Sequence, residues 1–148
     1  MSPRRRGRTI SLMLGLGGLV AEACSRDAIP PASIDSAFAQ AESTYLRGAP
    51  DTAETELNGL LAAAEARGDR QAAGRAVAAL AMVAYRKADY DSMRRLGERA
   101  LTMPLRAADR FRAHNVLGLG AYYQSRYREA GPFLDQAIDD ARRTGDSL

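Results

Sequence analysis

The chain has 148 residues, no tryptophan and 46% hydrophobic residues, which is enough sequence for one folded core rather than two. Its formal net charge of +3 depends on arginines close to the start of the chain. After Cys24 there are 17 basic and 17 acidic residues, interspersed along the sequence. This even mixture excludes the clustered positive surface on which nucleic-acid binding depends, so we expect no nucleic-acid partner.

Residues 1–23 are predicted to be a signal peptide. Four arginines in the first eight residues precede an apolar stretch from Ile10 to Ala21, which is shorter than the roughly 20 residues of a membrane span. Ala21-Glu22-Ala23 then has the A-x-A form of a cleavage site. The sequence therefore predicts export from a bacterial cytoplasm.

The residue after this site, Cys24, is the only cysteine, so it cannot form a disulfide within the chain. Its position resembles that of the lipid-carrying cysteine of bacterial lipoproteins, which implies lipidation and a periplasmic or outer-membrane-anchored location. The chain departs from the lipoprotein pattern at Ala21 and Glu22, where an aliphatic and a small residue are usual. Secretion with a free thiol at the new N-terminus is the alternative. Residues 24–33, which contain Pro30 and Pro31, are expected to form a short stiff tether.

From residue 34 onward the sequence repeats itself. Tyr45, Tyr85 and Tyr122 occupy the same place in three copies, which are offset by 40 and 37 residues. Each copy divides into two segments with helical apolar periodicity, and such a period is typical of a helical solenoid. We predict helices at 34–47, 52–67, 70–87, 91–102, 105–124 and 128–143.

Residues at the predicted helix ends support these boundaries. Gly68 follows the second helix, where a left-handed residue is favoured, and Asp69 is placed to cap the third. Asp51 and Glu54 have the spacing of a capping box at the start of the second helix. Pro132, about one turn into the last helix, removes a backbone hydrogen bond and is expected to kink that helix or delay its start.

Small residues accompany the repeated tyrosines; the third copy carries Gly118, Tyr122, Ala130 and Ala137. This pattern resembles the tetratricopeptide (TPR) repeat over residues 34–148, although the tyrosine sits one place later than in the family. The resemblance implies an all-α, right-handed solenoid of about three antiparallel helix pairs. It also implies that the first helix of each pair lines a concave groove that binds a peptide or protein.

The resemblance assigns groove positions by register. These positions are Asp35, Phe38, Glu42, Tyr45, Arg75, Met82, Tyr85, Arg86, Arg112, Asn115, Leu119, Tyr122 and Tyr123. The arginines and Asn115 could donate hydrogen bonds to an anionic segment. In the alternative interpretation, Tyr45, Tyr85 and Tyr122 pack between repeats and the arginines form a solvated face.

No combination of residues in the chain predicts catalysis. His114 is the only histidine, and no paired metal-ligand spacing accompanies it. Gly118-Leu119-Gly120 lies within a helical pattern with no preceding strand, so close helix packing explains it better than a dinucleotide loop. We therefore expect no enzymatic activity within these residues, no cofactor and no metal.

The leading hypothesis is a protein–protein interaction scaffold. A second hypothesis is the N-terminal sensory or regulatory region of a larger signalling protein, such as a histidine kinase or caspase-like protease, with its catalytic domain beyond residue 148. A third, a small-molecule-binding periplasmic protein, predicts a closed apolar pocket. Gly145-Asp146 matches Gly68-Asp69, where another repeat begins. We therefore expect either a longer protein or self-association through the uncapped last repeat.

Overall fold

The computed structural model describes residues 31–145. The predicted signal peptide, Cys24, most of the predicted tether and residues 146–148 lie outside this range. The described residues form only α-helices, which confirms the all-α prediction. The helices are α1 (Pro31–Leu46), α2 (Pro50–Ala66), α3 (Arg70–Arg86), α4 (Tyr90–Leu101), α5 (Ala107–Tyr123) and α6 (Tyr127–Thr144).

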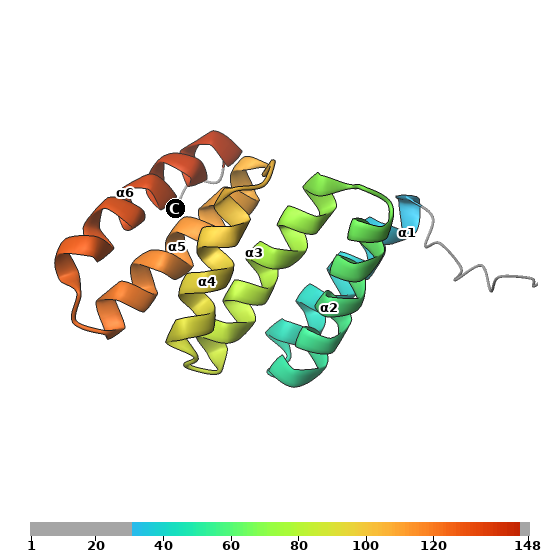
Figure 1. Cartoon of the computed structure of the whole chain (residues 1–148), viewed down its shortest axis with the longest axis horizontal. Coiled ribbons are helices and arrows are strands. Elements are labelled where there is room, and N and C mark those ends of the chain that lie inside the picture. Colours follow the sequence, from blue (N-terminus) through green and yellow to red (C-terminus); the bar gives the residue numbers. More distant parts are fainter. Residues whose placement is uncertain (1–30, 146–148) are drawn as a thin grey trace, which may run out of the picture.

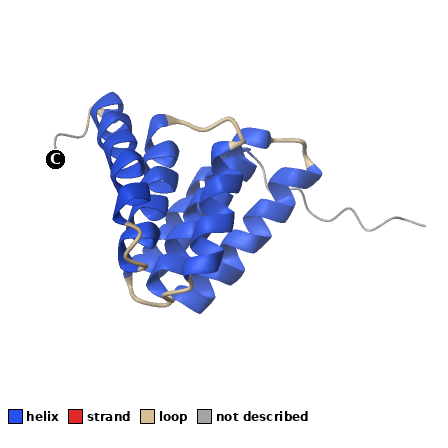
Figure 2. Cartoon of the chain, turned by 60° about the vertical axis from the view of Figure 1, so that its left-hand side comes forward, coloured by secondary structure: helices blue, strands red, loops and turns tan. Residues whose placement is uncertain are grey.

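The helices are stacked in chain order. Figure 1 shows the array running from α1 and α2 at one end to α6 at the other, and Figure 2 shows it turned by 60°. Each helix contacts the next one along the chain. Alternate helices also meet, because α3 contacts both α1 and α5. None of the helices in the described part of the chain is long and apolar enough to cross a membrane.

The helix boundaries differ from the predicted ones by at most three residues at any end. The largest difference is at α1, which begins at Pro31 because proline at a first helical position lacks only an N–H that would have no partner there. Pro132 does not delay the start of the last helix, contrary to one of the two effects expected of it. The last helix begins at Tyr127, one residue earlier than predicted, and continues through the proline.

The turns inside the three helix pairs have the same backbone conformation. Gly48, Ala88 and Ser125 lie at corresponding places and have positive φ angles of 81°, 54° and 59°. In each turn the following residue donates its N–H to a carbonyl of the preceding helix, at 3.2, 3.0 and 2.8 Å. Alanine and serine rarely adopt this conformation, and Gly68, in the turn between α2 and α3, has it as well.

The predicted caps are confirmed at one helix and wrong at another. Gly68 has a φ of 68°, and the Asp69 carboxylate accepts the N–H of Ala72 at 2.9 Å. The capping box at α2 does not form, because Pro50 is the first residue of that helix and no side chain caps it. Asp51 is instead in the first turn.

The carboxylates of Asp51 and Glu54 contact the ammonium group of Lys87 at 2.8 and 2.7 Å. Hydrogen bonds to these two carboxylates raise the pKa of Lys87 above its ordinary value. The two acidic residues therefore link α2 to the turn after α3 rather than closing the start of their own helix.

Small residues allow the helices to approach closely at several crossing points. A Cβ at Gly118 of α5 would lie 2.6 Å from Leu134 Cδ2 and 3.3 Å from the Leu134 backbone nitrogen of α6. A Cβ at Gly97 of α4 would lie 2.8 Å from Leu117 Cγ of α5. Close packing therefore explains Gly118, as the sequence indicated.

Replacing Gly118 with alanine is expected to destabilise the protein. The added Cβ must move the α6 backbone or the Leu134 side chain, and overpacking of this kind costs about 1–3 kcal/mol. Urea denaturation followed by circular dichroism measures the change in the free energy of unfolding.

Gly59→Ala is the matched control, because a Cβ at Gly59 on α2 has nothing within 4 Å. Alanine is a better helix former than glycine, so this variant is expected to gain up to about 1 kcal/mol. A Gly118→Ala protein as stable as the Gly59→Ala protein would contradict the close approach of α5 and α6.

Candidate functional site

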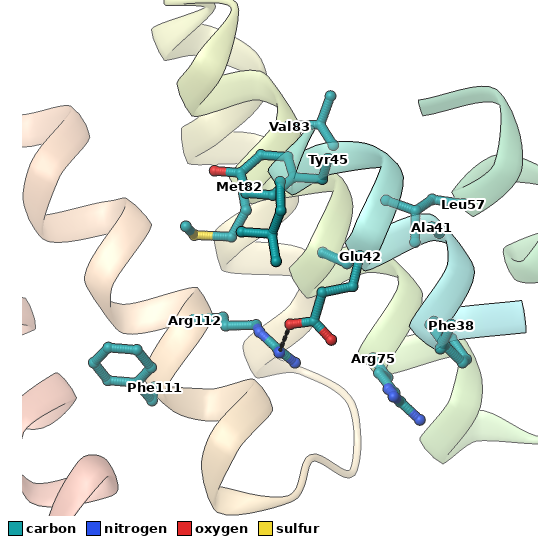
Figure 3. Close-up of a pocket in the computed structure, with 12 residues that line it drawn as sticks. Phe38, Ala41, Glu42, Tyr45, Leu57, Arg75, Met82, Val83, Phe111 and Arg112 are labelled. Carbon is teal, nitrogen blue, oxygen red and sulfur yellow. Dashed lines mark hydrogen bonds and ion pairs between the residues drawn. The ribbon is translucent and has the colours of Figure 1, made fainter. Parts of the chain in front are cut away.

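A hollow opens between α1, α3 and α5, on the side where these helices contact one another (Figure 3). Its volume is about 170 Å³, and most of its lining is apolar. We call it the α1–α3–α5 hollow. It is lined by Phe38, Ala41, Glu42, Tyr45, Leu46, Leu57, Arg75, Ala79, Met82, Val83, Phe111 and Arg112.

About half of the predicted groove positions lie at this hollow. They are Phe38, Glu42, Tyr45, Arg75, Met82 and Arg112. These residues come from three helices separated in sequence, so the register carried over from the repeat pattern brings them together as expected. The remaining predicted positions, Asp35, Tyr85, Arg86, Asn115, Leu119, Tyr122 and Tyr123, do not line it.

An ion pair bridges the two outer walls of the hollow. The Arg112 guanidinium on α5 donates to the Glu42 carboxylate on α1 at 2.7 Å, across 70 residues of sequence (Figure 3). It also donates to Asp109, one turn earlier on α5, at 2.9 Å. Because the Asp109 side chain is only 4% exposed, this second contact fixes the position of Arg112.

A second arginine, Arg75 of α3, also lines the hollow. The Arg75 guanidinium stacks 4.1 Å above the Phe38 ring and donates to the Asp35 carboxylate at 2.6 Å. The cation–π contact holds the charged group against an apolar wall while one edge remains available for hydrogen bonding. Asp35 therefore lies beside the hollow and pairs with Arg75, but it does not line the hollow.

Arg86 contacts Tyr45 and Tyr85 contacts Tyr123 across successive helix pairs, whereas Tyr122 packs against its neighbour Tyr123 on α5. Arg86 stacks on Tyr45 at 4.8 Å. The Tyr123 ring lies 6.1 Å from Tyr85 and 5.7 Å from Tyr122. A side-chain hydrogen bond to Tyr85, which keeps the proton on the Tyr123 hydroxyl, raises the pKa of Tyr123. The packing alternative therefore describes Tyr85 better than the groove prediction does.

Asn115 and Leu119 lie on α5 and are half-buried. Leu119 packs against a small core cluster that includes Met93 and Val116, so it contributes to the core beneath the surface. Asn115 is on the same helix as Phe111 and Arg112, which line the hollow, but it does not line it. Neither position adds a polar group to the hollow.

The predicted groove positions did not include half of the residues that line the hollow, namely Ala41, Leu46, Leu57, Ala79, Val83 and Phe111. Helical spacing of three residues from Phe38 and Met82 could have identified Ala41 and Ala79. Leu57 could not have been found in this way. It lies on α2, and the register admitted only the first helix of each pair.

His114 takes part in a buried polar network between α5 and α6. Its Nδ1 lies 2.8 Å from one oxygen of Asp140, and Arg110 Nε donates to the other oxygen at 3.0 Å. The Asp140 side chain is 2% exposed. Burial raises the pKa of Asp140, but the hydrogen bonds from Arg110 and His114 outweigh burial and hold that pKa below its ordinary value. The network joins the two helices.

Replacing Asp140 with asparagine is expected to lower the free energy of unfolding at pH 7 by about 1–3 kcal/mol, because Arg110, His114 and Arg143 lose a charged hydrogen-bond partner. A carboxyl whose pKa is lowered by folding contributes stability above the unfolded pKa of about 4, and this stability is lost as pH falls through the lower folded pKa. The difference from the unmodified protein should therefore shrink below about pH 4 in urea denaturation measured at pH 7 and pH 3.

Asp139→Asn is the control, since the Asp139 side chain is 60% exposed and contacts Arg142 at 3.1 Å. Its effect should stay below about 1 kcal/mol at either pH. An Asp140→Asn protein whose stability falls with acid as steeply as that of the unmodified protein would refute the network as the source of the pH dependence.

The residues of the hollow and of the buried network contain no metal-binding arrangement, and the described part of the chain has no cluster of three or more histidine, cysteine, aspartate or glutamate ligands. No protein-family model, curated protein or solved structure matches this chain.

Proposed function

We propose that this protein is a binding module built from TPR-like repeats, and that it binds a segment of another polypeptide in the α1–α3–α5 hollow. The observation that carries the proposal is the hollow itself, where aromatic and aliphatic side chains, mostly from α1, α3 and α5 with Leu57 from α2, surround an apolar space together with two arginines. Apolar concavities with a few fixed polar groups are the usual form of a binding site.

The repeat interpretation is supported by the order of contacts and by the turns. Helices that follow one another are in contact, and α3 touches α1 and α5. The turns at Gly48, Ala88 and Ser125 share one conformation. We infer a right-handed solenoid of three helix pairs, in which α1, α3 and α5 form the inner layer.

The chemistry of the hollow favours a ligand with one large apolar side chain. Phe38, Tyr45 and Met82 offer polarisable surface that adapts to aliphatic or aromatic groups. The guanidinium groups of Arg75 and Arg112 hold acidic partners but have five donors each, so they can also donate to backbone carbonyls or acidic side chains of the ligand.

We place this module outside the cytoplasm, on the basis of residues 1–24. The proposed role is that of an exported scaffold or assembly factor, anchored through lipid at Cys24 or released. The apolar hollow is open to solvent beside Glu42 and Asp35, whose side chains are 50% and 69% exposed. Such an open site suits a polypeptide segment better than a fully enclosed small molecule.

Ala79→Phe should block binding by filling the hollow. Ala79 lines the hollow and is half-buried, so a phenyl group placed there occupies the space of the ligand's anchor. The probe is a set of fluorescent peptides selected from a random display library for binding to the full chain. We expect the selected peptides to share a large apolar residue and to bind the variant at least about tenfold more weakly in fluorescence anisotropy.

Ala62→Phe on the exposed side of α2 is the matched control and should leave affinity unchanged. Circular dichroism establishes that both variants are folded. Equal affinity of the selected peptides for a folded Ala79→Phe protein would remove the hollow as the binding site.

A further inference from the structure

The first and second helix pairs each end in a surface that contacts a planar side chain. That side chain comes from the first helix of the following pair. Tyr85, at the end of α3, and Tyr90, at the start of α4, lie 6.1 and 6.2 Å from the ring of Tyr123 on α5. The Tyr123 ring is tilted by 36° to one and stacked on the other at 28°. Two tyrosines of one pair thus hold a third from the next pair.

The junction between the first two pairs has the same form. Arg86, near the end of α3, places its guanidinium 4.8 Å from the centre of the Tyr45 ring. Tyr45 and Pro50 precede Tyr85 and Tyr90 by 40 residues each, and Arg86 precedes Tyr123 by 37. A planar guanidinium therefore takes the place of the tyrosine ring in this junction.

The third pair carries the same two tyrosines on its outer side. Tyr122 and Tyr127 follow Tyr85 and Tyr90 by 37 residues, and their ring centres are 5.4 Å apart. They are 52% and 61% exposed. Ile138 on α6 is 40% exposed, whereas Leu61, at the corresponding place in the first pair, is 9% exposed. We call Tyr122, Tyr127 and Ile138 the α6 end face.

We propose that the α6 end face docks an amphipathic α-helix of another polypeptide, which places an arginine or tyrosine against Tyr122 and Tyr127. This surface is separate from the α1–α3–α5 hollow, so the inference goes beyond the proposed function. Its support is the repetition within one molecule: the two corresponding surfaces, one with Tyr45 and one with Tyr85 and Tyr90, each contact a helix through a planar side chain at the corresponding position.

The two docked helices define the pattern that the partner helix needs. In α3 the positions are Ala76, Leu80 and Arg86; in α5 they are Ala113, Leu117 and Tyr123. The alanines are fully buried and the leucines are 6% and 5% exposed. A fitting partner helix therefore carries a small residue, a leucine four positions later and an arginine or tyrosine six positions after that.

The first helix of a second copy of this chain does not fit the pattern. The corresponding positions in α1 are Ser36, Gln40 and Leu46, so two polar residues stand where alanine and leucine are buried in α3 and α5. Burying such polar side chains against an apolar surface costs free energy unless each finds a partner. This argues for a different polypeptide as the occupant.

The probe is a peptide of residues 107–123, labelled with fluorescein at its N-terminus, because this segment ends in the tyrosine that the corresponding surface already holds. We expect it to bind the full chain saturably in fluorescence anisotropy. Tyr127→Ala in the protein should weaken binding about three- to tenfold, the usual worth of an aromatic pair. Replacing the peptide's terminal tyrosine with alanine should weaken binding by the same factor. Combining this peptide with the Tyr127→Ala protein should weaken binding little more than either change alone, because both changes remove the same contact.

Ala62→Phe is the control variant, since Ala62 is exposed on α2, at the far end of the array from α6 and outside the hollow. It should not change binding of the probe, and neither should Ala79→Phe, which blocks only the hollow. Affinity that does not depend on Tyr127, or effects of the two changes that simply add, would overturn the proposal. So would a dimer of the unmodified chain in sedimentation that dissociates on Tyr127→Ala, because a second copy would then cover the face.

Discussion

The close approach of neighbouring helices, made possible by glycine and alanine on their contact lines, is the constraint on which the rest of the structure depends. Leu134 lies where a Cβ of Gly118 would be, and Leu117 lies close to the corresponding position at Gly97. Since interiors are packed as densely as crystals, a larger side chain at these two contact points would push the neighbouring helices apart. Larger aromatic and charged side chains are therefore displaced to the inner surface and to the ends of the pairs, where binding can occur.

This displacement gives each first helix two roles. Its small residues contact the preceding pair. Its larger residues either line the α1–α3–α5 hollow or contact an aromatic side chain of the preceding pair. On α3, Met82 lines the hollow, while Arg86, one turn later, covers Tyr45. On α5, Arg112 reaches across to Glu42 of α1, so α1 and α5 are linked across the apolar space of the hollow. The hollow is thus a consequence of how the pairs are stacked.

Local pattern predicted the helices well because their limits are set by nearby residues. Gly68 and Asp69 mark the boundary between α2 and α3 through backbone conformation and a cap three residues away. The capping box at Asp51 failed because the helix begins at Pro50, which leaves Asp51 inside the first turn, where it contacts Lys87. The repeat register likewise placed half of its groove positions at the hollow. It could not show that Leu57 of α2 reaches the hollow, since that depends on how the helices of different pairs pack.

The arginines of the inner surface also limit what can give a ligand its affinity. Arg75 contacts Asp35 and Phe38, and Arg112 contacts Glu42 and Asp109. An acidic ligand must therefore compete with carboxylates that are already in place, and exchanging one ion pair for another yields little net free energy. Burial of apolar surface meets no such competitor in the hollow. Arg75 and Arg112 are thus better suited to orienting a bound segment than to attracting it, and the apolar anchor is expected to supply most of the binding energy.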